Sequence, residues 1–179
     1  MSGKLLIAGV GNIFLGDDGF GVEVANRLAT SALPDFVRVA DYGIRGMHLA
    51  YDLASSYDGA ILVDATARGG APGTIYLIEP ELSADGAEAG DLSPLFNAHG
   101  MQPDVVLSML SLLDSRDLQV LVVGCEPANV DYGIGLSEPV AAAVDEAVAV
   151  IADLVARAAS AGGYLPAMKE QAYVPRHPG

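Results

Sequence analysis

The sequence has a single cysteine and no long apolar run, so it lacks the usual features of disulfide-linked, zinc-bound and membrane-spanning proteins. It holds one cysteine in 179 residues, Cys125, which excludes an internal disulfide and a cysteine-rich zinc site. No apolar run approaches the roughly 20 residues of a membrane-spanning helix, and the N-terminus lacks a secretory signal pattern. We therefore expect a cytoplasmic protein with no membrane partner, in which Cys125 is buried and inert.

Basic residues are also scarce. The chain has 9 Lys and Arg against 23 Asp and Glu, a formal net charge of −14, and its basic residues are scattered singly. Nucleic-acid binding depends on clustered cations, so no nucleic-acid partner is expected. Apolar residues, in contrast, make up 51% of the chain and charged residues only 18%, which indicates a globular domain with a substantial core.

Short apolar runs alternate with stretches of helical periodicity along the chain. The apolar runs predict five strands, at 4–9, 36–41, 59–65, 73–79 and 118–124. The periodic stretches predict four helices, at 20–28, 47–56, 103–113 and 140–155. Ser137 is the expected N-cap of the last helix. This order predicts an α/β three-layer sandwich, with a five-stranded, mostly parallel sheet and helices on both faces.

The pattern departs from strict alternation once within the sheet and again at the C-terminus. No helix separates 59–65 from 73–79, so one antiparallel pair is predicted in the sheet. Neither a repeat nor a linker interrupts the pattern, so residues 1–162 are expected to form a single domain. Residues 163–179 carry three prolines and little periodicity, which predicts a loosely packed C-terminal tail.

The stretch GVGNIFLGDDGFG, residues 9–21, begins like the glycine fingerprint of a dinucleotide-binding fold and then departs from it. Phe14 stands where a third glycine would let helix and strand pack closely. Asp17 and Asp18 stand where a pyrophosphate would meet the helix N-terminus, and they would repel it. A nucleotide-binding enzyme is therefore disfavoured. Asp17 is expected to cap the helix, and the glycines on either side would let Asp18 face the cleft.

Polar side chains recur at the carboxyl ends of the predicted strands, the edge at which parallel sheets bind ligands. Asp18 follows the first strand, Asp41 ends the second and Asp64 lies at the end of the third, while His99 precedes the helix at 103–113. Each alone has a structural explanation, such as a cap or a local hydrogen bond. Together, Asp18, Asp64 and His99 form a donor set suited to a divalent transition metal, with positions left open for water or substrate.

Five stretches in this order resemble the [NiFe]-hydrogenase maturation endopeptidases, the proteases that trim the C-terminus of the hydrogenase large subunit. They are GVGNIFLGDDGFG, DYGIRGMHL, ILVDA, NAHGMQPDVV and GCEPANVDYGIGLSEPV, and the likeness covers residues 4–155. The resemblance implies an endopeptidase that removes the C-terminal extension of a nickel-loaded large-subunit precursor. It also implies that the substrate supplies the nickel, that Asp18, Asp64 and His99 bind it, and that other divalent cations substitute in vitro.

The same resemblance bears on Asp41, whose equivalent matters for cleavage. Either the metal, Asp41 or Asp18 would activate the attacking water. This copy reads DYGIRG where some relatives have Gly-Thr at the middle positions, which makes Arg45 a candidate contact to the partner, and Asp18 replaces a frequent Glu. Two alternatives stay open, a non-catalytic nickel-sensing chaperone and a generic divalent-metal hydrolase. Cleavage assays on nickel-loaded and nickel-free precursor would separate them.

Overall fold

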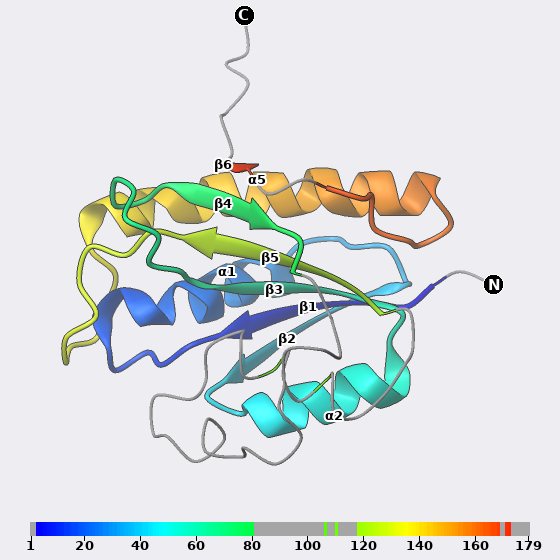
Figure 1. Ribbon diagram of the computed structural model, residues 1–179, viewed down its shortest axis with the longest axis horizontal. Coiled ribbons are helices and arrows are strands. Elements are labelled where there is room, and N and C mark those ends of the chain that lie inside the picture. Colours follow the sequence, from blue (N-terminus) through cyan, green and yellow to red (C-terminus); the bar gives the residue numbers. More distant parts are fainter. Residues whose placement is uncertain (1–2, 81–105, 107–109, 111–117, 169–170, 173–179) are drawn as a thin grey trace, which may run out of the picture.

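A mostly parallel sheet forms the centre of the computed structural model, which describes residues 3–80, 106, 110, 118–168 and 171–172. Its strands are β1 (Leu5–Val10), β2 (Val37–Gly43), β3 (Gly59–Ala65), β4 (Ile75–Ile78), β5 (Gln119–Cys125) and β6 (Gln171–Ala172). Their order across the sheet is β2-β1-β3-β5-β4-β6 (Figure 1). The predicted fold class is confirmed, because all five expected strands form, and the two-residue β6 extends the sheet at its edge.

β4 is antiparallel, as one strand was expected to be, but its neighbour is not the strand that precedes it. It pairs with β5 from Ile75↔Cys125 to Ile78↔Val122, and β6 pairs with its other edge. β3 is parallel to β1 on one side and to β5 on the other. Both edges of β3 are therefore occupied, which leaves β4 only the outer edge of β5.

Helices cover both faces of the sheet (Figure 1). They are α1 (Phe20–Ala29) and α5 (Glu138–Ser160) on one face and α2 (Gly46–Ser56) on the other. Because side chains alternate along a strand, Leu5 and Ile7 of β1 join the core under α1 and α5, and Leu6 and Ala8 join the core under α2. Burial on both faces explains why the strands read as continuous apolar runs.

Two residues of the helix expected at 103–113 are described, Val106 and Leu110. Both are helical and buried in the core on the α2 side, four residues apart as one face of a helix requires. The rest of that segment lies outside the described residues. No helix within the part of the chain that the structure describes is long and apolar enough to span a membrane.

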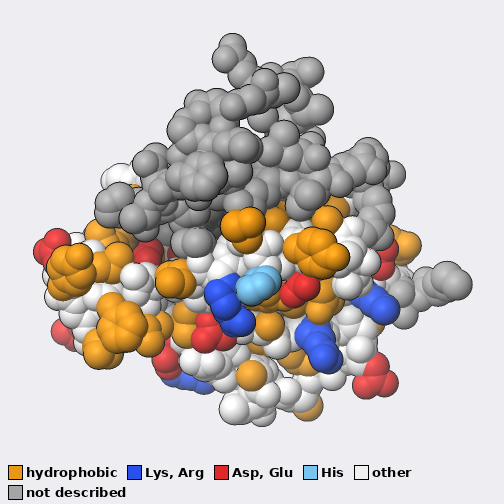
Figure 2. Space-filling model, turned by 90° about the horizontal axis from the view of Figure 1, so that it is seen from below, with side chains coloured by type: hydrophobic (Ala, Val, Ile, Leu, Met, Phe, Trp, Pro, Cys, Tyr) orange, Lys and Arg blue, Asp and Glu red, His pale blue; other side chains and the backbone are white. Residues whose placement is uncertain are grey.

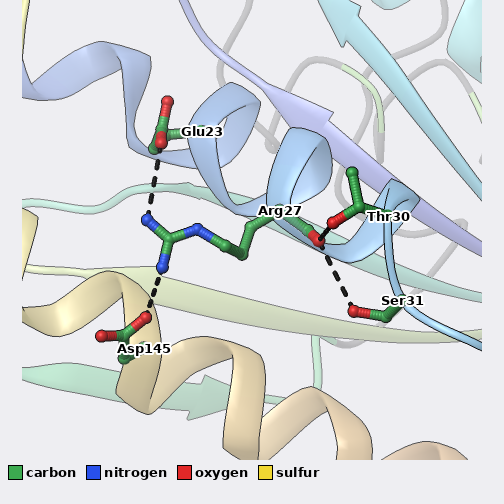
Figure 3. Close-up of polar contacts among 5 residues, drawn as sticks. All are labelled: Glu23, Arg27, Thr30, Ser31 and Asp145. Atoms are coloured by element: carbon green, nitrogen blue, oxygen red, sulfur yellow. Dashed lines mark hydrogen bonds and ion pairs between the residues drawn. The ribbon is translucent and has the colours of Figure 1, made fainter.

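Charged side chains join α1 to α5 at their exposed edge. Arg27 of α1 contacts Glu23, one turn earlier in the same helix, and Asp145 of α5 (Figure 3). Thr30 and Ser31 close the end of α1 by donating their hydroxyls to the Arg27 carbonyl. The three charged side chains are about half exposed or more, so each ion pair contributes about 0–1 kcal/mol to stability. The apolar core, rather than this contact, holds the two helices together.

The described part of the C-terminal segment is packed, so the expectation of a loose tail is wrong there. Leu165 is buried in the core under α1 and α5, and its N–H donates to Gln119 Oε1 at 2.9 Å. The Met168 N–H donates to Glu79 Oε2 at 2.7 Å, just before β6 pairs with β4. Cys125 is fully buried, as predicted, and burial together with nearby carboxylates raises the pKa of its thiol to about 12.

Candidate active site

Gly11 lies where the backbone of Asp18 and the carboxylate of Asp64 come together, at the carboxyl edge of the sheet. It follows β1 with a φ of +127°, and its N–H donates to the Gly43 carbonyl at the end of β2 at 3.0 Å. A Cβ at this position would overlap the Asp18 carbonyl oxygen and would lie 3.3 Å from Asp64 Oδ1. Glycine is therefore required at position 11 for two reasons: its positive φ, and the close approach of Asp18 and Asp64.

Asp18 is held by the turn that leads into the short 3-10 helix η1 (Gly16–Gly19). Its Oδ2 accepts a hydrogen bond from the Asn12 N–H at 2.8 Å, and the Asn12 side chain in turn accepts from the Phe14 N–H at 2.9 Å. Gly16 has a φ of +53° and lies against the Asn129 carbonyl, where a side chain would not fit. The glycine-rich turn thus holds a half-buried Asp18 beside the end of β1, and the expectation that it faces a cleft stays a prediction.

Asp64 is buried near the end of β3, with 1% of its surface exposed. Its Oδ1 accepts from the Ala65 N–H at 2.8 Å. Charged groups in such a position are stabilised by hydrogen bonds, by an opposite charge or by a metal ion. A buried carboxylate next to the Asp18 turn therefore has the chemistry of a cation site.

Asp41 lies on β2, on the other side of β1 from β3, and is exposed. Its Oδ1 approaches Gly43, which is the residue that accepts the hydrogen bond from Gly11. Arg45 donates to the carbonyls of Asp41 and Tyr42, and its guanidinium lies 5.7 Å from the centre of the Tyr42 ring. Arg45, predicted to contact a partner, therefore shapes the loop that follows Asp41; its role toward a partner stays a prediction.

Asp17 has a different environment from Asp18, although the two are adjacent. It is fully buried and accepts four hydrogen bonds of 2.7–2.9 Å, from the N–H groups of Ala128, Asn129 and Ser137 and from the Ser137 hydroxyl. Burial alone raises the pKa of Asp17, but these hydrogen bonds outweigh it and hold the pKa below its ordinary value. The carboxylate is therefore charged at neutral pH.

The prediction that Asp17 caps the following helix is wrong. Neither η1 nor α1 has a side-chain cap, and Asp17 instead binds the loop that leads into α5. Ser137 is the N-cap residue of α5, as predicted, but its hydroxyl donates to Asp17 rather than accepting from the helix. No local pattern could reveal this contact, because the donors lie 111 to 120 positions away along the chain.

A third buried carboxylate, Glu126, was not singled out from the sequence. It follows β5, and it accepts from the Arg68 N–H at 2.8 Å, the Gly69 N–H at 3.2 Å and the Tyr76 hydroxyl at 2.9 Å. Burial raises the pKa of Glu126, but these hydrogen bonds outweigh it and lower the pKa overall. Glu126 thereby fixes the loop that follows Asp64. Its place at the carboxyl end of a predicted strand was the signal that could have drawn attention to it.

His99, the third predicted metal ligand, lies outside the described residues. Within the described part of the chain, no group of three or more His, Cys, Asp or Glu side chains is placed to hold a metal ion. The structure thus brings the Asp18 backbone and the Asp64 carboxylate together at Gly11, with Asp41 on β2, which is separated from β3 by β1. The assignment of Asp18, Asp64 and His99 as a ligand set stays a prediction.

Similarity to known proteins shows which family the chain belongs to. The family model for hydrogenase maturation proteases matches residues 22–154. The chain belongs to this family. The hydrogenase 2 maturation protease of Escherichia coli K12 is 32% identical over 147 residues, which are 81% of this chain and 86% of that protein. The predicted recognition and enzyme class, a peptidase of hydrogenase maturation, are thus confirmed.

Solved structures of hydrogenase maturation proteases share the fold. A hydrogenase 2 maturation peptidase from a Thaumarchaeota archaeon superposes with a TM-score of 0.64 at 29% identity, over 90% of this chain and 99% of that one. An endopeptidase from Escherichia coli superposes with a TM-score of 0.70 at 29% identity, over 91% of this chain and 97% of that one. Both likenesses cover nine-tenths or more of this chain, so the fold as a whole is shared.

Proposed function

We propose that this protease removes the C-terminal extension of a nickel-loaded [NiFe]-hydrogenase large-subunit precursor. The observation that carries the proposal is that the Asp18 backbone and the Asp64 carboxylate both lie against Gly11, where an added Cβ would meet them. Carboxylate oxygens combined with an imidazole suit a divalent transition metal. Membership of the hydrogenase maturation proteases supports a protein substrate of that pathway.

The nickel belongs to the substrate in this proposal. Asp18, Asp64 and His99 bind it and so hold the extension against the edge of the sheet, and other divalent cations substitute for it in vitro. Cleavage then depends on metal loading, because a nickel-free precursor lacks the ion that these side chains bind. The proposal places the reaction in the cytoplasm, with neither a membrane nor a nucleic acid as a further partner.

Asp41 is the proposed general base. Asp18 and Asp64 are assigned to nickel, whereas Asp41 is exposed on β2, which pairs with β1, and lies beside the Gly43–Gly11 contact. Its carboxylate takes a proton from water as the water oxygen attacks the scissile carbonyl carbon. The C–N bond then breaks, and the proton passes to the departing nitrogen, which leaves as an amine.

The test is the trimming of purified precursor, followed as a mobility shift on a denaturing gel, with and without nickel loading. We expect trimming only of the nickel-loaded precursor, and its loss in Asp64→Asn. The matched control is Asp58→Asn, at the opposite end of β3, where the carboxylate is exposed and accepts from the Lys4 N–H. Equal trimming of nickel-free precursor, or normal trimming by Asp64→Asn, would overturn the proposal.

A further inference from the structure

Large hydrophobic side chains are exposed on two loops beside the candidate active site. Ile13 and Phe14 lie between β1 and η1, and Val130, Tyr132 and Ile134 lie between β5 and α5. Tyr132 is 94% exposed, Ile134 79% and Phe14 58%. Figure 2 shows hydrophobic side chains gathered at the left of the face, the end at which Figure 1 places the carboxyl ends of the parallel strands.

The two loops form one hydrogen-bonded frame. The Gly133 N–H donates to the Phe14 carbonyl at 2.9 Å, and the Gly16 N–H donates to the Gly133 carbonyl at 2.8 Å. The Asp17 N–H donates to the Asn129 carbonyl at 2.9 Å, and the Asp17 carboxylate accepts from the same loop. The exposed side chains are therefore presented in a defined arrangement.

A hollow of about 280 Å³ opens between the loops. It is lined by Gly16 and Asp17 at the start of η1 and by Asn129 and residues 131–137 from the loop between β5 and α5. Asp17, which lines the hollow, directly precedes Asp18 in η1, so the hollow lies next to the turn that carries Asp18. The charged side chains that line the hollow are acidic, the buried Asp17 and the exposed Asp131, and the exposed Glu138 directly follows the last lining residue.

We propose that Phe14, Tyr132 and Ile134, together with this hollow, form the docking surface for an apolar segment of the protein substrate, flanked by Lys or Arg. In taking that substrate to be the large-subunit precursor, the inference rests on the proposed function. Contiguous exposed apolar side chains on an ordered surface mark interaction sites, and aromatic anchors dominate their binding energy. A protease also has to hold its polypeptide substrate beside the bond that it cleaves.

Charge decides between a substrate and a second copy of this chain as the occupant. The chain has a formal net charge of −14, Asp131 lies at the hollow, and the exposed Glu138 follows its last lining residue. Two copies meeting here would bring like charges together, which is unfavourable. A segment that carries Lys or Arg beside its apolar side chains complements these acidic side chains.

The test compares the double variant Tyr132→Ser/Ile134→Ser with wild type, using nickel-loaded large-subunit precursor as the probe. We expect KM for trimming and Kd for the precursor to rise roughly tenfold, with kcat within about twofold of wild type. The matched control is Tyr164→Ser, a 49% exposed tyrosine that follows α5, near Gly3 at the opposite end of the sheet. Asp131→Lys should raise KM by about threefold, less so in high salt.

The outcomes separate this inference from the proposed function. If wild type trims the precursor and the double variant keeps the same KM and Kd, the docking surface is refuted and the proposed function stands. If wild type binds the precursor without trimming it and the double variant loses binding, the function is refuted and the surface stands. A wild-type dimer that the double variant abolishes, with Kd for the precursor unchanged, would assign the surface to self-association. Should the double variant unfold, the two single variants carry the same test.

Discussion

The Asp17 carboxylate accepts two hydrogen bonds from Ser137, from its N–H at 2.7 Å and from its hydroxyl at 2.8 Å. The two residues are 120 positions apart, and their contact joins the turn that carries Asp18 to the start of α5. Asp17 is fully buried, so these bonds are shielded from water. The placement of the candidate site therefore depends on the docking of the last helix.

Asp17→Asn is expected to destabilise the protein by about 2–4 kcal/mol, because an amide group would face N–H donors that now meet a carboxylate. Ser137→Ala removes only the hydroxyl contact and is expected to lose about 1 kcal/mol. Ser160→Ala, at the exposed end of α5, is the control and should lose less than about 0.5 kcal/mol. Urea unfolding measures all three, and an Asp17→Asn variant as stable as wild type would contradict the assignment.

Acid should weaken the protein through the same carboxylate. The folded-state pKa of Asp17 lies below the ordinary value of 3.8, so its contribution to stability is fully present above that value and is lost as pH falls through the lower folded pKa. We expect the free energy of unfolding of wild type to fall steeply below about pH 4, and that of Asp17→Asn to fall less. Urea titrations at a series of pH values measure both curves, and parallel curves would exclude Asp17 as the source.

Gly11→Ala is expected to abolish trimming and to cost about 3 kcal/mol or more of stability. The added Cβ would meet the Asp18 carbonyl and approach Asp64 Oδ1, at a φ of +127°. Gly162→Ala isolates the conformational penalty, because Gly162 has a φ of +73° with no atom within 4 Å of an added Cβ. That control should lose about 1–2 kcal/mol and trim normally. Normal trimming by Gly11→Ala would show that the Asp18–Asp64 approach is not needed.

Asp41→Asn should separate binding from chemistry. An amide cannot take a proton from water, so we expect trimming to slow by about 100-fold or more while the nickel-loaded precursor still binds. Pull-down of the precursor, run beside the gel assay, reports the two steps independently. Lost binding would move Asp41 from general base to docking residue.

His99→Ala should fail at the earlier step, because it removes one of three proposed ligands to the substrate's nickel. We expect both pull-down of the nickel-loaded precursor and its trimming to be lost. His99→Gln should recover little, since an amide is a poor ligand for a borderline metal. Trimming at the wild-type rate by His99→Ala would exclude His99 from nickel recognition.

Most of the fold was readable from local sequence. β3 runs from Gly59 to Ala65, as its apolar run predicts, and α1 begins at Phe20, where the four-residue spacing starts. These patterns are local because burial on two faces of a strand, or along one face of a helix, leaves its own periodicity. The candidate carboxylates were readable for a related reason: parallel strands place their carboxyl ends at one edge, so Asp18, Asp41 and Asp64 had to lie near one another.

Only the tertiary structure shows that two adjacent and identical residues have different partners. Asp17 and Asp18 are adjacent acids in one turn, yet Asp17 is committed to donors from Ala128 to Ser137, and Asp18 lies beside Gly11 and Asp64. β4 pairs with β5 because β1 and β5 already occupy both edges of β3. Hydrogen-bond partners and free strand edges depend on which distant segments arrive at the same place, and no short stretch of sequence encodes that.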